Sequence, residues 1–351
     1  MARFKMEKKI RPRTFAYAFL VMGAAYILSV CVMLYGFGER NFLVDGAVRY
    51  LPFPAAVVNR SGFVTVREVD GNLGAVKRFY ENQDFSDIGL RVDFTTEDGR
   101  KRLKIKEKDI LNKLIEDRMI ELLADDRDIA ITKEMVSQNV QREMEQYGNG
   151  PEVEKTIFNL YGWDIDDFKE KIVKPDMYRD ELDKSRRATD GNFVQAETKI
   201  TNAREEIAGG KDFAEVAGKY SEGDSAENGG DLGWFTADQM MPEIAVAAFI
   251  MKKGEYSDVI ESPIGFHIIR IDDKKTEDGI DKIRIRQVLV RTRSFADWLL
   301  EEEKDMDVSL LSKDYYWDSE TASVRFKSAQ MDEFEKKLEE NSAGDISMMF
   351  Q

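Results

Sequence analysis

Residues 213–271 read FAEVAGKYSEGDSAENGGDLGWFTADQMMPEIAVAAFIMKKGEYSDVIESPIGFHIIRI. The glycines of GGDLG predict a tight turn, because glycine reaches backbone angles that other residues avoid. The last strand holds His267, the only histidine of the chain. The stretch predicts a mixed module with these elements in order: a helix at 213–220, a polar loop at 221–228, a turn at 229–233, a short strand at 234–235, a helix at 240–251 and a strand at 264–270.

The stretch resembles the parvulin family of peptidyl-prolyl cis-trans isomerases in the order of four motifs. These are the loop with GGDLGWF, the QM pair before a helix, the KxGE turn and the GFHII strand. The resemblance covers about sixty contiguous residues. It implies an α+β fold, in which helices surround a four-stranded antiparallel sheet. The alternative is an ordinary α+β module whose glycines only make turns.

The family's usual first strand is missing before residue 191, but a similar strand, IRIRQVLVR, follows the module at 283–291. The turn-rich segment between strand 266–271 and strand 283–290 predicts an antiparallel hairpin. In the parvulin sheet the last and first strands pair, so the resemblance implies a circularly permuted domain over 191–293. A second, degenerate copy of the module starting at 283 is the alternative.

An X-Pro bond isomerises over a barrier of roughly 18–20 kcal/mol, because resonance keeps the amide planar. The reaction needs an apolar pocket for proline and stabilisation of the twisted amide, and no cofactor or metal is expected. The resemblance assigns the pocket and the polar positions to named residues. The pocket comprises Leu232, Met240 and Ile244, and we also expect Phe266 there; the polar residues are His267, Ser262, Gln287 and Asp224.

Two of these positions depart from the family pattern. Gln287 stands where the family has its first-strand histidine, and Gly223 stands where it has Cys or Asp. We expect Gln287 to hydrogen-bond His267 and fix its tautomer, and Asp224 to supply the acidic group from the next position. The alternative for His267 is a buried structural histidine.

The N-terminus predicts a membrane anchor. Residues 1–13 hold six basic residues against Glu7 alone, and residues 15–37 carry no charge. At about 1.5 Å per residue this run spans roughly 35 Å, enough to cross a ~30 Å hydrocarbon core. We expect a cytoplasmic tail at 1–13, a single transmembrane anchor at 14–37 and an extracytoplasmic remainder. A cleaved signal peptide and a lipoprotein signal at Cys31 are the alternatives.

Residues 38–190 predict a helical domain that begins with a short hairpin, formed by the β-type runs at 51–58 and 63–66. Apolar residues recur at helical spacing from about 104 onward. The segments LNKLIEDRMIELLADDRDIAITKEMV and LYGWDIDDFKEKI resemble the N-terminal chaperone domain of SurA- and PrsA-type foldases. A helical spacer is the alternative. Residues 294–351 predict a tail that begins with a helix-like run and then becomes acidic, and residues 312–351 carry no functional signal.

Composition excludes several classes of function. The chain of 351 residues has a net charge of −15, so a nucleic-acid partner is not expected. One Cys and one His cannot make a zinc site or a disulfide framework within the chain. The hypothesis is therefore a membrane-anchored isomerase and foldase for unfolded exported polypeptides that contain X-Pro. The alternative is a non-catalytic holdase that uses the parvulin fold as a binding platform.

Overall fold

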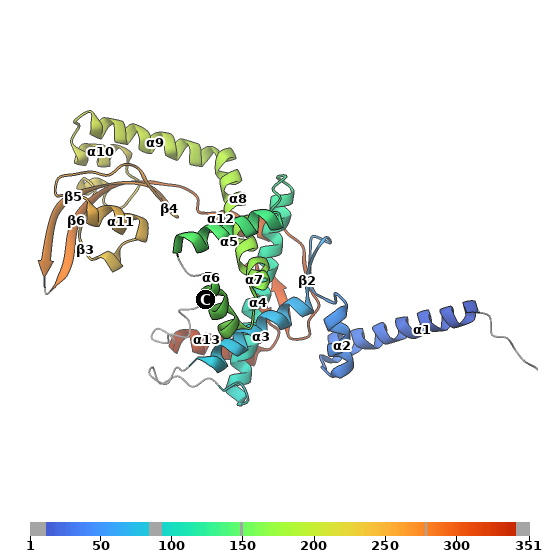
Figure 1. The fold of residues 1–351 in the computed structure, drawn as a ribbon. Helices are drawn as coiled ribbons and strands as arrows, with labels where there is room; N and C mark the ends of the chain where they lie inside the picture. Colours follow the sequence, from blue (N-terminus) through green and yellow to red (C-terminus); the bar gives the residue numbers. More distant parts are fainter. Residues whose placement is uncertain (1–11, 84–92, 148–149, 278, 342–351) are drawn as a thin grey trace, which may run out of the picture. The chain divides into compact units, whose positions relative to one another are not determined.

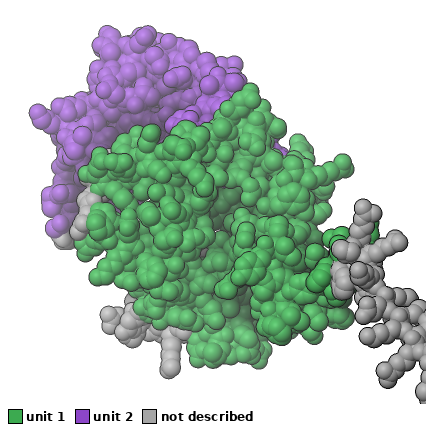
Figure 2. Space-filling view, turned by 45° about the vertical axis from the view of Figure 1, so that its right-hand side comes forward, with its two compact units in different colours: residues 1–178, 303–351 green, residues 179–302 purple. Residues whose placement is uncertain are grey.

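The chain divides into two compact units (Figure 2). The structure, a computed structural model, describes residues 12–83, 93–147, 150–277 and 279–341. Unit 1 comprises residues 1–178 and 303–351, and unit 2 comprises residues 179–302. Unit 2 is therefore an insertion in the chain of unit 1. The boundaries differ from the expected 190/191 and 293/294, because residues 179–190 and 294–302 pack with the inserted module.

Unit 1 begins with the apolar helix α1 (Pro12–Cys31), which continues as a π-helix (Val32–Phe37). Residues Ala16–Phe37 have a mean hydropathy of 2.2, and among the described residues this is the one helix long and apolar enough to cross a membrane. A short helix, α2 (Phe42–Tyr50), follows directly. Figure 1 shows α2 beside the C-terminal end of α1.

The expected hairpin is present and is part of a three-stranded sheet. Strand β1 (Pro54–Val58) pairs with β2 (Gly62–Thr65) through a turn at Asn59 and Arg60, which both have positive φ. Strand β7 (Val308–Leu310) pairs with the other edge of β1, which gives the order β2-β1-β7. The C-terminal segment therefore completes a sheet that begins about 250 residues earlier in the chain.

Helices make up most of unit 1. Side-chain caps begin two of them: Thr132 accepts a hydrogen bond from the Met135 backbone N–H, and Asp164 accepts one from that of Asp167. The helix α3 was not predicted, although Thr65 and Glu68 form the capping box that marks its start. The helices are α3 (Val66–Asn82), α4 (Glu97–Asp125), α5 (Lys133–Tyr147), α6 (Gly150–Tyr161), α7 (Ile165–Phe168), the π-helix Lys169–Val173 and α8 (Lys174–Thr189).

Residues 294–341 are folded, which corrects the expectation of an acidic tail. After α12 (Phe295–Lys304) and β7, the hairpin β8 (Tyr315–Asp318) and β9 (Ser323–Phe326) and the helix α13 (Ala329–Asn341) follow. The buried Tyr315 hydroxyl donates to the Glu107 carboxylate on α4 at 2.9 Å. Strands are predicted from apolar side chains at every second residue, and in strands of three or four residues this pattern is a weak signal. The acidic residues around these short strands therefore dominated the prediction.

Unit 2 contains a four-stranded antiparallel sheet in the order β3-β6-β5-β4, with bounds β3 (Asp231–Phe235), β4 (Ile260–Ser262), β5 (Gly265–Glu277) and β6 (Ile280–Arg291). The predicted hairpin is confirmed, since Phe266 pairs with Val290 and His267 with Leu289. The strand 283–291 lies within β6, in the middle of the sheet, where the permuted arrangement requires it.

Helices cover both faces of this sheet (Figure 1). Helices α9 (Gly191–Ala208) and α10 (Phe213–Tyr220) pack on one face, where Ile200 and Phe213 meet Ile268 and Val288 in a buried cluster. Helix α11 (Pro242–Ile250) packs on the other face, with Ile244 at the centre of a second cluster. The sheet thus has a core on each side.

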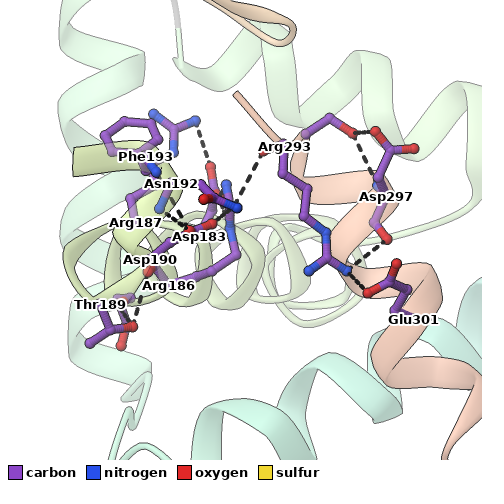
Figure 3. A network of polar contacts seen from close by, with 12 residues as sticks. Asp183, Arg186, Arg187, Thr189, Asp190, Asn192, Phe193, Arg293, Asp297 and Glu301 are labelled. Carbon is purple, nitrogen blue, oxygen red and sulfur yellow. Dashed lines mark hydrogen bonds and ion pairs between the residues drawn. The ribbon is translucent and has the colours of Figure 1, made fainter. Parts of the chain in front are cut away.

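A polar network joins the first and last segments of unit 2 (Figure 3). The Arg186 guanidinium, only 4% exposed, donates to Asp183 at 2.7 and 3.0 Å and to Asp190 at 3.3 Å. It also donates to the Arg293 backbone carbonyl at 3.3 Å. A buried cation needs such partners. Here they join the segment that begins unit 2 to the segment that ends it.

Candidate active site

The alternation of side chains along β5 decides which residues can form the site. Successive residues of a strand point to opposite faces. His267 and Ile269 therefore lie on the α11 face, whereas Phe266 and Ile268 lie on the α9–α10 face. The expectation that Phe266 lines the pocket with His267 is wrong: Phe266 is 5% exposed and stacks edge-to-face on Phe193, with ring centroids 5.1 Å apart.

His267 lies on the α11 face of β5 and is fully buried. Its Nε2 is 2.7 Å from the Ser262 Oγ, and its Nδ1 is 3.3 Å from the Gln287 Oε1. The pairing register explains both contacts. Ser262 lies opposite Gly265, and Gln287 lies opposite Ile269, so each is displaced by two residues from His267 and points to the same face.

The partners define the protonation of the imidazole. With the Gln287 amide oxygen assigned toward Nδ1, that nitrogen donates its proton and Nε2 is left as an acceptor, and the Ser262 hydroxyl lies within reach of both Nε2 at 2.7 Å and the Gly265 carbonyl at 3.2 Å. The Ile264 backbone N–H in turn donates to the Ser262 Oγ at 3.2 Å. Burial lowers the pKa of His267 below its ordinary value of 6.5, against the opposing effect of the Gln287 hydrogen bond. The ring is therefore neutral at pH 7.

A loop continues the sheet beside Gln287. The Ser221 Oγ accepts a hydrogen bond from the Leu289 N–H at 3.1 Å, and the Glu222 N–H donates to the Leu289 carbonyl at 2.6 Å. The Glu222 carboxylate accepts the Arg291 N–H at 2.8 Å. Ser221 and Glu222 were missed from the sequence, because polar loop residues are common and only the pairing with β6 distinguishes them.

Glycines allow this loop to lie close to β6. Gly230 has a φ of +81°, and a Cβ there would lie 2.4 Å from the Gln287 carbonyl oxygen, so no other residue fits without a shift. Gly223 is buried beside Gln287 and Leu289, with 3.6 Å between its would-be Cβ and the Gln287 Nε2. Asp224 is exposed, and the structure brings it into no contact with His267.

Leu232, Met240 and Ile244, the other three residues expected to bind proline, share one apolar cluster on the α11 face. Ile244 is 4% exposed, and Leu232 and Met240 are partly buried against the same apolar cluster. A neutral imidazole with fixed partners beside apolar side chains can bind an uncharged, apolar ring and orient a dipole against a rotating carbonyl. Among the described residues no group of three His, Cys, Asp or Glu side chains could hold a metal.

Comparison with known proteins agrees with this geometry. The family described as Rotamase, the PPIC-type PPIASE domain, matches residues 181–273. Foldase protein PrsA 1 of Bacillus cereus is 37% identical over 130 residues, which cover 35% of this chain and 46% of that protein. Chaperone SurA of Methylobacillus flagellatus is 37% identical over 115 residues, 31% of this chain and 26% of that protein. The chain thus spans less than half of the length of both relatives.

Two further similarities extend over more of the chain. Foldase protein PrsA of a Geobacillus species is 28% identical over 258 residues, which cover 70% of this chain and 84% of that protein. The crystal structure of the peptidylprolyl isomerase PrsA from Bacillus anthracis aligns with 66% of this chain at 19% identity. Its TM-score of 0.20 is too low to indicate a shared arrangement of the aligned parts.

Proposed function

We propose that the PPIC-type PPIase domain formed by residues 181–273 is an active peptidyl-prolyl cis-trans isomerase, completed by strand β6. The observation that carries this proposal is the buried His267, held neutral between Ser262 and Gln287 on an apolar face. Leu232, Met240 and Ile244 would bind the proline ring, leaving the preceding carbonyl free to rotate. No covalent step is needed, since the barrier is the resonance of the amide.

The whole chain would act as a membrane-anchored foldase for exported polypeptides. The apolar segment Ala16–Phe37 would cross the membrane once, with the basic N-terminus in the cytoplasm and both units outside. The helices of unit 1 would hold unfolded segments while unit 2 isomerises their X-Pro bonds. A cleft in unit 1 is lined by Met144 and Ile165 together with polar side chains such as Gln141 and Lys169, and it could bind such a segment.

The test is isomerisation of a proline-containing tetrapeptide by the full-length protein in detergent micelles. We expect a rate above background that falls about 10²-fold in His267→Ala, the size typical of losing one preorganised polar group. Ile280→Ala, at a position 54% exposed at the start of β6, is the control that keeps the rate. Circular dichroism verifies the fold of both variants. A rate equal to background in the wild type contradicts the proposal.

A specific observation also supports a holdase without catalysis. Gly223 supplies no thiol or carboxylate beside Gln287, and the neighbouring Asp224 is exposed. In that case the protein suppresses aggregation of an unfolded client without accelerating isomerisation. Met144→Lys in the unit 1 cleft would then weaken aggregation suppression, whereas His267→Ala would leave it unchanged.

A further inference from the structure

The helix α2 folds back along the apolar helix that precedes it. Gly38, with a φ of +63°, ends the π-helix, and the Asn41 side chain caps α2 by accepting the N–H groups of Leu43 and Val44. The Tyr26 hydroxyl donates to the Leu43 carbonyl at 2.8 Å. Tyr26 is near the middle of the apolar segment Ala16–Phe37, and the apolar contacts of α2 lie in the C-terminal part of the segment, from Val30 onward.

This packing shortens the part of the apolar segment that is bare. Val44, Ala47 and Val48 of α2 are buried in one cluster with Val30 and Phe53. From Thr14, the first residue after Arg13, to Ser29, the last residue before the buried Val30, the helix has sixteen residues. At about 1.5 Å per residue they span ~24 Å, which is less than the ~30 Å of a hydrocarbon core. A membrane span therefore has to include the part of the segment that α2 covers.

The outward side of α2 is suited to that depth. At 100° per residue, Phe42, Leu43, Gly46 and Tyr50 form one continuous arc opposite the buried residues. Phe42 is 82% exposed, Tyr50 is 78% exposed and Leu43 is 45% exposed. Fully exposed aromatic side chains are unfavourable in water and are enriched at membrane interfaces.

The charges around α2 fit the same location. Arg40 pairs with Asp45, the one acidic residue of the helix, at 2.8 Å and also with Asp70 at 2.6 Å. Arg49 lies at the edge of the apolar arc, and the Arg67 guanidinium donates to its carbonyl at 3.3 Å. Both side chains are exposed. Cations at the rim of an apolar face can bind lipid phosphates while the face enters the acyl boundary.

We propose that α2 is an interfacial helix whose Phe42–Tyr50 face lies in the outer lipid interface and seats unit 1 directly on the membrane. The inference rests on the proposed membrane anchor and adds a second lipid contact to it. Lipid is favoured over a protein partner because the face is continuous with the apolar segment that α2 covers. The foldase would then be fixed close to the membrane surface rather than hanging from a flexible linker.

Depth measurements by nitroxide labelling test the inference. The full-length protein, with Cys31→Ser as background, is reconstituted into bilayers of zwitterionic and anionic lipids, with single labels at Phe42→Cys and Tyr50→Cys. Leu20→Cys in α1 reports the anchor, and Val153→Cys on α6, 43% exposed, reports an aqueous site of unit 1. At each position the nitroxide collides with oxygen, which enters the bilayer, and with a nickel complex, which stays in water. We expect the ratio of the two collision rates at positions 42 and 50 to lie between the values of the two controls and several-fold above that at position 153.

The outcomes separate this inference from the anchor itself. Values at 42 and 50 equal to that at 153, with position 20 in the bilayer, overturn the interfacial helix and leave the anchor intact. Low collision with both reagents at 42 and 50 means that protein covers the face, a second copy or another partner, and also overturns it. An aqueous position 20 contradicts the anchor, and the inference with it. In the reconstituted wild type, we expect lipid to shield Arg49 from water-soluble reagents. In the double variant Phe42→Ser/Tyr50→Ser, we expect those reagents to reach Arg49.

Discussion

The two faces of the unit 2 sheet have the same strands but different tasks. On the α9–α10 face, Ile268 and Val288 are fully buried among apolar side chains only. On the α11 face, the equally buried His267 interrupts the apolar cluster with a polar relay to Ser262 and Gln287. Because neighbouring residues of one strand point to opposite faces, an apolar core residue and a residue of the proposed site can be adjacent in sequence.

The largest expected effect is on the apolar face. Ile268→Ala should lower the free energy of unfolding of unit 2 by about 3 kcal/mol, because it leaves a cavity in a dry core. The isomerisation rate per folded molecule should stay within about two-fold of wild type. Urea unfolding followed by circular dichroism measures the first quantity. A rate loss that exceeds the loss of folded protein would show that the faces are not independent.

Two serines that are equally buried, but have different hydrogen-bond partners, test the role of the polar contacts on the α11 face. Ser262 and Ser257 are each 7% exposed, but Ser262 bonds the His267 ring, whereas Ser257 accepts the Ile269 N–H. Ser262→Ala leaves Nε2 without its donor, which costs about 1.4 kcal/mol, or ten-fold in kcat/KM. Ser257→Ala should change stability and leave kcat/KM of the folded protein intact. Equal rate losses in the two variants would rule out a role for the Ser262–His267 bond.

The departures from the family pattern can be reversed by substitution. Gln287→His and Gly223→Asp together restore the residue types that the parvulin resemblance implies. A Cβ at position 223 meets only ordinary contacts of 3.6 Å, so the backbone there accepts a side chain beside residue 287. We expect kcat/KM to rise by roughly three- to ten-fold, about 1 kcal/mol. Gly223→Ala is the control for the added bulk, and a rate no higher than that of the control would contradict the expectation.

The smallest effect is the pH dependence. Burial lowers the pKa of His267 below 6.5, so the unfolded state binds a proton more readily than the folded state. The stability that this residue contributes is complete above pH 6.5 and decreases as pH falls toward the folded-state pKa. The rate should therefore be flat at neutral pH and fall only in acid. Between pH 6.5 and pH 5, the free energy of unfolding of His267→Ala should decrease less than that of the wild type. Urea unfolding at each pH measures this difference.

Local patterns were sufficient for the elements that depend on neighbours in sequence. The helix at 213–220 and the β5–β6 hairpin involve residues close along the chain, and each was predicted; the turn expected at 229–233 is shorter, because β3 already begins at Asp231. The Gln287 contact with His267 was also predicted, because a hairpin register places both on one face. The assignment of Phe266 was wrong although the same alternation rule excludes it.

The sequence by itself determined the apolar N-terminal helix, the parvulin-like module and the identity of the buried histidine, since periodicity and turn chemistry are local properties. Only the tertiary structure decided that β7 joins β1 and that Tyr315 packs on α4. It also decided that Arg186 ties the ends of the inserted unit and that α2 lies along α1. These contacts join residues up to about 250 positions apart, where no short-range pattern specifies the partner.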